Sequence, residues 1–193
     1  MRIIAGSFRS RTLDAPPGFE TRPTSDRLRE TLFNVLAPRI EGARFLDLYA
    51  GSGAVGIEAL SRGVARVEFV EKAPAALKVL RANLAKLGIT GNFQIDSGSV
   101  AGALKRLTKA NAAFELIFLD PPYDAADEYE TALRSLEALL APGGLAIAEH
   151  RRKVKLGARY SSLERTRLLE QGDASLSFYA VRPSSNETGP STK

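Results

Sequence analysis

Phe45-Leu-Asp-Leu-Tyr-Ala-Gly-Ser-Gly-Ala-Val-Gly56 is the stretch of sequence that decides the fold, because an apolar strand pattern runs directly into a glycine-rich turn. Gly51, Gly53 and Gly56 have the spacing of the loop between the first strand and the first helix of dinucleotide-binding proteins. Glu71 stands about 20 residues later, where that fold places the acid that binds a ribose. The stretch therefore predicts a strand–loop–helix unit that holds a cofactor.

Asp47 distinguishes this loop from the loop of an ordinary nucleotide-binding site. Its carboxylate stands four positions before Gly51, at the carboxyl end of the strand, and there it would repel a pyrophosphate. It suits a cofactor that has no phosphate and carries a positive ammonium group, as S-adenosylmethionine does. Glu71 would then accept hydrogen bonds from both ribose hydroxyls. The alternatives at this point are a tight turn with solvated acids and a nicotinamide-dependent dehydrogenase.

Strand and helix patterns alternate from Arg44 onward. Helical stretches cover residues 74–87 and 129–140, and each is followed by a glycine or proline–glycine stop. Such alternation predicts an α/β fold with a doubly wound, mostly parallel sheet. A hairpin of residues 165–170 and 175–181 would close the sheet. The expected parallel strands are Phe45–Leu48, Val67–Val70, Phe93–Ile95, Leu116–Leu119 and Leu145–Ala148.

Residues 1–22 are expected to form an RNA-binding arm ahead of this domain. The alternation over Arg2–Leu13 is broken by a Gly-Ser turn, which predicts a β-hairpin. A helix follows, which Thr24 or Ser25 would cap and Pro38 would end.

A second motif, Asp120-Pro-Pro-Tyr123, follows an apolar strand pattern. Pro121 and Pro122 fix the backbone and remove two N–H donors, so the loop presents mainly hydrogen-bond acceptors. Asp120 and the Pro121 carbonyl can accept both hydrogens of a planar NH2 group, while Tyr123 stacks on its ring. This predicts methyl transfer to an exocyclic amine, with Asp120 stabilising the positive charge that develops. A turn in which Asp120 caps the next helix is the alternative.

The composition restricts the chemistry. The 193 residues contain no cysteine and one histidine, His150, which excludes disulfides, thiolate catalysis and a Cys/His zinc site. We expect His150 to be a surface residue after a strand, and we expect no metal. This shortage favours a reaction in which a cofactor supplies the reactive group. Residues 23–183 would form the catalytic domain, and the polar residues 184–193 would be a disordered tail.

Charge and hydropathy bear on partners and location. The net charge of +5 admits a polyanionic partner, and basic residues gather in residues 1–44 and 151–168. These blocks predict an RNA-binding face, with a solvated basic surface as the alternative. Phe8 would either stack on a base or pack under the hairpin. Because no apolar run reaches the length of a membrane span and no secretory signal is evident, we expect a cytoplasmic protein without membrane contact. We also expect a monomer.

Several motifs together resemble a known family. Those of class I N-methyltransferases are matched by Asp47, Gly51-Ser-Gly53, Glu71 and Asp120-Pro-Pro-Tyr123. The chain resembles the RsmD family from Arg2 to about Pro183, on the strength of Arg2-Ile-Ile-Ala-Gly6, Arg9-Ser-Arg11 and Arg22-Pro-Thr-Ser-Asp-Arg-Leu-Arg-Glu-Thr-Leu-Phe-Asn34.

The resemblance implies a Rossmann-like class I methyltransferase fold, with a seven-stranded, mostly parallel sheet and helices on both faces. It implies S-adenosylmethionine as the cofactor. The implied target is N2 of one guanine in bacterial 16S ribosomal RNA of an assembling small subunit. Ser99 departs from the family, because many relatives place an acid there against the adenine amine.

The candidate site residues fall into three groups. The cofactor-binding candidates are Asp47, Tyr49, Ala50, Gly51, Ser52, Gly53, Glu71, Lys72, Ser99 and Val100. The catalytic candidates are Asp120, Pro121, Pro122 and Tyr123. The RNA-binding candidates are Arg2, Arg9, Arg11, Arg22, Arg27, Arg151 and Arg152.

Other functions stay open on the sequence alone. A methyltransferase of this kind could act on adenine N6 in DNA or RNA, or on a protein glutamine amide, since those amines also suit the loop. A non-catalytic RNA-binding assembly factor would keep the fold, although the intact Asp120–Tyr123 loop argues against it.

Overall fold

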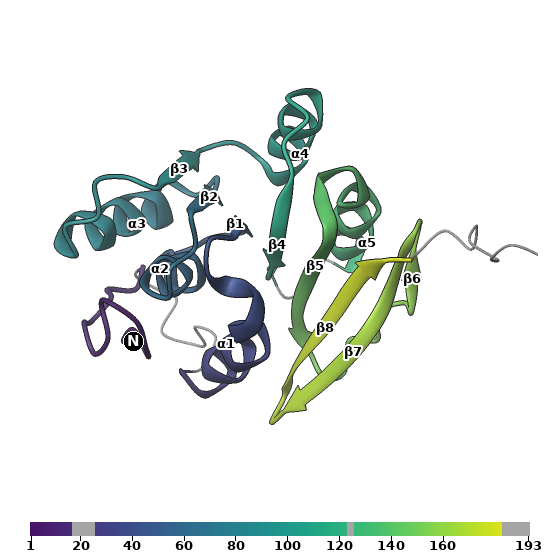
Figure 1. Ribbon diagram of the computed structural model, residues 1–193, viewed down its shortest axis with the longest axis horizontal. Coiled ribbons are helices and arrows are strands. Elements are labelled where there is room, and N and C mark those ends of the chain that lie inside the picture. The colour runs from purple at the N-terminus through teal and green to yellow at the C-terminus, as the bar shows by residue number, and fades with distance from the viewer. Residues whose placement is uncertain (17–25, 123–125, 183–193) are drawn as a thin grey trace, which may run out of the picture.

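One sheet of eight strands forms the centre of the computed structural model, which describes residues 1–16, 26–122 and 126–182 (Figure 1). The strand order is β3-β2-β1-β4-β5-β8-β7-β6; β3 to β5 are parallel, and β8, β7 and β6 are antiparallel to their neighbours. The strands are β1 (Arg44–Leu48), β2 (Arg66–Val70), β3 (Phe93–Asp96), β4 (Phe114–Leu119), β5 (Leu140–Arg151), β6 (Arg159–Tyr160), β7 (Leu163–Gln171) and β8 (Ala174–Val181).

Helices cover both faces of the sheet (Figure 1). The first face packs against α1, α2 and α3, and the second packs against α4 and α5. The helices are α1 (Asp26–Ile40), α2 (Ala54–Ser61), α3 (Pro74–Lys86), α4 (Val100–Lys109) and α5 (Ala126–Ser135), followed by the 3-10 turn η1 (Glu137–Leu139).

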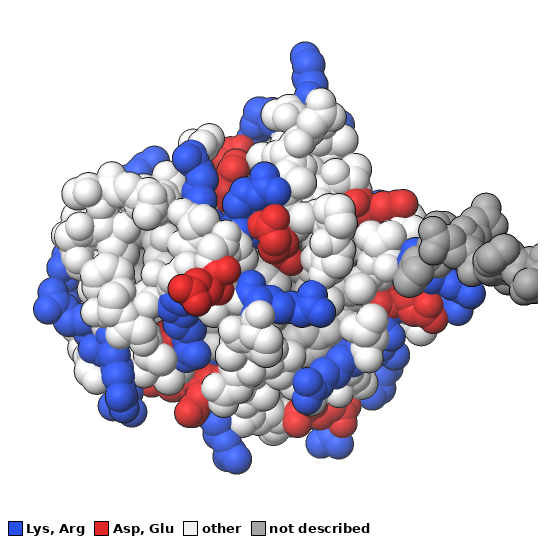
Figure 2. Space-filling model, viewed as in Figure 1, with Lys and Arg blue, Asp and Glu red and all other residues white. Residues whose placement is uncertain are grey.

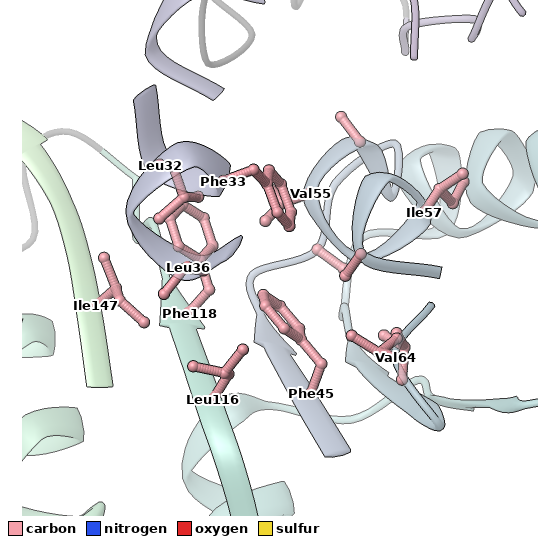
Figure 3. Packing of buried hydrophobic residues seen from close by; sticks show 14 of the residues in the cluster. Leu32, Phe33, Leu36, Phe45, Val55, Ile57, Val64, Leu116, Phe118 and Ile147 are labelled. Carbon is pink, nitrogen blue, oxygen red and sulfur yellow. The ribbon is translucent and has the colours of Figure 1, made fainter. Parts of the chain in front are cut away.

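The apolar run of β4 follows from its position in the middle of the sheet. Leu116 and Phe118 point to the α1 side, whereas Ile117 and Leu119 point to the α5 side. Figure 3 shows Phe118 close to Leu32 of α1 at the first of these faces. A strand buried on both faces needs apolar residues at every position, so it shows no polar alternation.

The register of the central strands brings their carboxyl ends together. Leu48 of β1 pairs with Leu119 of β4, which pairs with Ala148 of β5. The loops that follow these strands therefore leave the sheet side by side. In open α/β sheets this edge is where ligands bind.

The predicted Rossmann-like fold is confirmed, with differences in detail. The sheet has eight strands instead of seven, because the two residues of β6 add a short edge strand beside β7. The stretch expected as one helix over 129–140 is divided into α5 and η1, and β5 begins already at Leu140. Helix α4, which was not predicted from the sequence, begins at Val100 after a Ser99 cap.

Pro38 does not end the first helix, contrary to expectation. Helix α1 continues to Ile40, so Pro38 lies inside its last turn. A proline there removes only one hydrogen bond, and burial of Ile40 in the core holds the turn in place. The expected caps, Thr24 and Ser25, lie outside the described residues.

The described part of the N-terminal arm, residues 1–16, is not a regular hairpin. One antiparallel bridge, Arg2 to Thr12, closes it. Its backbone also bonds to helix α2: the Ile4 and Ala5 amides donate to the Glu58 carboxylate at 2.8 and 3.0 Å. Glu58 is fully buried, and its charge is balanced by Arg62 at 2.7 Å and by Arg29 at 3.8 Å. The arm is thus held by side chains of the domain as well as by backbone hydrogen bonds of its own, such as those from Ile3 to Arg11 and from Ser10 to Ile3.

His150 was expected at the surface, and this is wrong: it lies within β5 and is 4% exposed. Its Nδ1 is 3.0 Å from the Arg151 carbonyl oxygen and must donate, so Nε2 accepts from the Ser177 hydroxyl at 2.9 Å. Both nitrogens are satisfied in the neutral ring. Burial lowers the pKa of His150, against the opposing effect of its backbone contacts. Among the described residues, no helix has the length and apolarity needed to cross a bilayer.

We expect the folded state to lose stability in acid because of His150. Its pKa is lowered by folding, so the unfolded chain takes up a proton first as the pH falls through the ordinary value of 6.5. The free energy of unfolding should fall by at most about 1.4 kcal/mol per pH unit through this group. Denaturant unfolding at about pH 5 and about pH 8 measures it. The same acid-induced loss in His150→Gln as in the unsubstituted chain would assign the effect to other groups.

Candidate active site

A cavity of about 580 Å³ opens at the carboxyl edge of the sheet, where the loops after β1, β2, β3 and β4 meet. It gathers nearly all of the cofactor-binding and catalytic candidates from the sequence. Residues that line it are Asp47, Tyr49, Ala50, Gly51, Ser52, Glu71, Lys72, Ser99, Val100, Asp120, Pro121 and Pro122. Gly53 is not part of the lining, and Tyr123 lies outside the described residues.

The glycine-rich loop needs an unusual backbone. Tyr49 has φ 64° although it carries a side chain, and Gly53 has φ 82°. A Cβ on Gly53 would stand 2.3 Å from Leu80, and a Cβ on Gly56 would stand 2.3 Å from the Phe69 ring. The second and third glycines therefore let α2 pack closely on α3 and β2. These two glycines shape the loop, and other residues of the loop line the cavity.

Asp47 is the buried acid of the loop. It is 2% exposed, and its carboxylate accepts a hydrogen bond from the Gly56 amide at 2.9 Å. Burial raises its pKa to about 7, since the charge of Glu71 adds to the effect and the Gly56 bond only partly offsets it. A carboxylate that lacks water in this way is stabilised by a positively charged ligand.

Glu71 stands at the end of β2 and closes the opposite side of the loop. Its Oε2 accepts from the Gly51 amide at 2.8 Å, and its Oε1 accepts from the Ala73 amide at 2.7 Å. Each carboxylate oxygen can accept two hydrogen bonds, so each keeps one acceptor position toward the cavity. The two positions suit a pair of neighbouring hydroxyl groups.

The Asp120 loop forms the wall beside β4. Asp120 is half-buried, Pro121 is buried and Pro122 is exposed. Tyr49, on the adjacent loop, is half-buried, and its pKa is raised by burial and by the Glu128 carboxylate at the start of α5. The loop after β3 supplies the third wall: Ser99 caps α4 by accepting from the Gly102 amide at 3.2 Å.

The cavity is acidic although the chain as a whole is basic. Carboxylates from four elements line it, against the side-chain ammonium group of Lys72. They belong to Asp47, Glu71, Asp120, Asp127 and Glu128. We call this space the acidic cavity. It favours a cationic ligand and disfavours a phosphorylated one. Among the described residues, no group of three or more His, Asp and Glu is placed to bind a metal ion.

The arm contributes to the acidic cavity, which was not predicted from the sequence. Met1, Ala15 and Pro16 are part of the lining. Asn83 of α3, which is fully buried, holds this segment: it accepts from the Asp14 amide at 2.9 Å and donates to the Asp14 carbonyl at 3.1 Å. The same side-chain amide donates to the carbonyl of Ser52 at 3.0 Å. No sequence signal connects an asparagine inside a helix with a loop 31 residues away.

Those predicted RNA-binding arginines that the structure describes do not line the acidic cavity. Arg2 and Arg9 are exposed on the arm, and Arg27 is exposed in the first turn of α1. Arg152 follows β5, where it pairs with Glu170 at 3.2 Å. The two other described candidates are Arg11, exposed on the arm, and Arg151, half-buried at the end of β5, while Arg22 lies outside the described residues.

Comparison with known proteins shows the family to which the chain belongs. The family model "Conserved hypothetical protein 95" matches residues 1–180. The chain belongs to this family. It is 38% identical over 188 residues to "Putative rRNA methyltransferase YlbH" of Bacillus subtilis (strain 168), a match that covers 94% of this chain and 100% of that protein. This membership confirms the resemblance to the RsmD family.

Further relatives agree. "Ribosomal RNA small subunit methyltransferase D" of Escherichia coli (strain K12) is 43% identical over 123 residues, which cover 64% of this chain and 60% of that protein. Among solved structures, "Putative methyltransferase yhhF from Escherichia coli" superposes with a TM-score of 0.80 at 36% identity, and the match covers 93% of this chain and 96% of that one. The fold is thus that of class I methyltransferases.

We expect Asn83→Leu to release the arm. Leucine has a similar volume but removes both hydrogen bonds to the Asp14 backbone and leaves the buried Ser52 carbonyl without this partner, the latter at a cost of about 1–3 kcal/mol. Limited trypsin digestion should then cut at Arg9 or Arg11 faster than in the unsubstituted chain. Leu84→Ala, a matched loss in the core of the same helix, should lower global stability without selective cutting of the arm. Equal cutting rates in both variants would contradict the clamp.

Proposed function

We propose that this chain transfers a methyl group from S-adenosylmethionine to the exocyclic N2 of a guanine in 16S ribosomal RNA of the assembling small subunit. The observation that carries the proposal is the acidic cavity at the carboxyl edge of the sheet, with the Asp120-Pro-Pro loop in its wall. Family membership and the names of the relatives support the ribosomal substrate.

The residues present fit this cofactor. Bound in the acidic cavity, S-adenosylmethionine supplies an electrophilic methyl group on a positive sulfur. Asp47 would stabilise the cationic ammonium end, because its carboxylate is buried and bonds to a neutral backbone amide. Glu71 would bind the two ribose hydroxyls through its remaining acceptor positions. Ser99, Val100 and the backbone near Gly98 would enclose the adenine ring.

The Asp120 loop would hold the amine that is methylated. Asp120 and the Pro121 carbonyl accept its two N–H groups, which orients the nitrogen lone pair toward the methyl carbon. Asp120 would stabilise the positive charge that develops on this nitrogen, and its carboxylate would accept the proton that the methylated amine releases. Tyr123 and Pro122, on the same loop, would stack on the base.

The basic residues would hold the RNA around this cavity. Arg2, Arg9, Arg11, Arg22 and Arg27 would bind phosphates from the arm and α1. Arg151 and Arg152, at the end of β5, would do the same. Residues 1–22 thus serve as the RNA-binding arm of a catalytic domain that spans residues 23–183.

We expect cofactor affinity to weaken as the pH falls below about 7. Asp47 is raised to this pKa by burial, and binding a cation restores its ordinary ionisation, so the complex releases a proton. Well below that pH the affinity should fall by up to about tenfold per pH unit. Calorimetry across this range measures the slope. Asp47→Asn should bind more weakly but with a flat profile; a slope that persists in this variant would assign the proton to another group.

We expect Asp120 to be needed for methyl transfer but hardly for cofactor binding. Its removal forfeits a hydrogen bond to a charged acceptor, worth about 1.5–3 kcal/mol, together with alignment of the amine. Asp120→Ala should therefore slow single-turnover methylation by about tenfold to several hundredfold, and Asp120→Asn less. Glu130→Gln, an exposed acid of α5, is the control.

The same assay tests the proposed product. Labelled methyl groups, mapped by mass spectrometry of digested nucleosides, should appear as N2-methylguanosine in small-subunit RNA. Label on adenine N6 or on a protein glutamine would overturn the target. Transfer by Asp120→Ala at the unsubstituted rate would overturn the mechanism.

A further inference from the structure

A second cavity, of about 570 Å³, lies between the arm and α1 on the outer side of the first helical layer. The arm contributes Arg2, Arg9 and Ser10, helix α1 contributes Arg27 and Asn34, and Arg62 stands at the end of α2. We call this space the basic groove. Figure 2 shows blue side chains on the left and lower parts of the face where the arm and α1 lie.

The groove carries net positive charge. Arg2, Arg9, Arg27 and Arg62 face two carboxylates, Asp26 and Glu30. Asp26 is already engaged by the buried Arg29 at 3.0 Å, with Arg2 at 3.7 Å. The remaining guanidinium groups therefore favour an anion, and arginine forks match phosphate oxygens in geometry.

Arg62 is held in a fixed position from which it can bind such an anion. Its Nε donates to Glu58 at 2.7 Å, and its guanidinium lies 4.8 Å from the centre of the Phe33 ring. The Glu58 carboxylate that fixes Arg62 also binds the Ile4 and Ala5 amides of the arm. Glu58 thus fixes the position of Arg62 relative to the part of the arm that lines the groove.

Polar groups without charge complete the lining. Asn34 offers an amide and Ser10 a hydroxyl, which can bind the edge of a base or a sugar. The volume falls within the range of about 300–1,000 Å³ that small-molecule sites occupy.

The groove and the acidic cavity are adjacent. Met1 lines the acidic cavity and Arg2, the next residue, lines the groove. The two spaces thus lie on either side of the first residues of the arm, with opposite charge. An RNA strand with one neutral base in the acidic cavity can place a phosphate next to it in the groove.

We propose that the basic groove is a second nucleotide site, which binds a phosphate-bearing nucleotide of the substrate RNA near the methylated guanine. This rests on the proposed function. The groove holds the strand by its backbone, and Asn34 and Ser10 contact the bound nucleotide. Arg62 and Asn34 thereby become RNA-contacting residues beside the arginines of the arm.

Crosslinking tests the contact directly, since the chain contains no cysteine. Asn34→Cys, labelled with a benzophenone maleimide, is mixed with small ribosomal subunits that lack the methyl group and is irradiated. The control is Lys109→Cys, which is exposed on α4 at the other face of the sheet. We expect RNA crosslinks at nucleotides flanking the target guanine from position 34 and background from position 109. Equal yields, or crosslinks only to ribosomal protein, would overturn the site.

Salt dependence provides a second measurement. Arg9→Gln with Arg27→Gln should lower the slope of log binding constant against log salt by about 0.7 for each RNA phosphate that the variant no longer binds. Arg81→Gln with Lys109→Gln removes the same charge elsewhere and should leave the slope unchanged. An equal change in both pairs would show a general charge effect and overturn the groove. Absence of methyl transfer by the unsubstituted chain would instead overturn the proposed function.

Discussion

The hydrogen bond between the Asp47 carboxylate and the Gly56 amide is the contact on which the site depends. It ties the end of β1 to the first turn of α2, so the glycine-rich loop is held open between them. A neutral side chain could make that bond at lower cost, because burial raises the pKa of this acid to about 7. The negative charge of Asp47 therefore adds little to the stability of the ligand-free protein. A charged group in such a position is typical of a binding site.

The sequence predicted the sheet and the loops at its edge because both depend on local patterns. Apolar runs such as Leu116–Leu119 identify strands buried on both faces, and Asp47, Glu71 and Asp120 lie at or directly after strand ends. Parallel register then brings such residues to one edge whatever the details of packing. Errors arose where tertiary contacts override local signals: packing of Ile40 extends a helix past Pro38, and pairing with β8 buries His150.

The part of the site built from distant segments could not be predicted. Asn83 has the pattern of an ordinary helical residue, yet it joins the arm at Asp14 to the glycine-rich loop at Ser52. Glu58 likewise holds the arm from a helix that was expected only to follow the loop. The role of such buried polar groups depends on partners 31 to 69 residues away, which no local pattern records.

The arm also has a consequence for the order in which the chain acquires structure during synthesis. Residues 1–16 are made before their partners, because Glu58 and Ser61 follow Ala5 and Phe8 by more than 50 residues and Asn83 follows Asp14 by 69. The segment that encloses the acidic cavity must therefore wait, undocked and basic, until helix α3 has formed. Its docking is therefore a late event of high contact order, which follows the formation of α3.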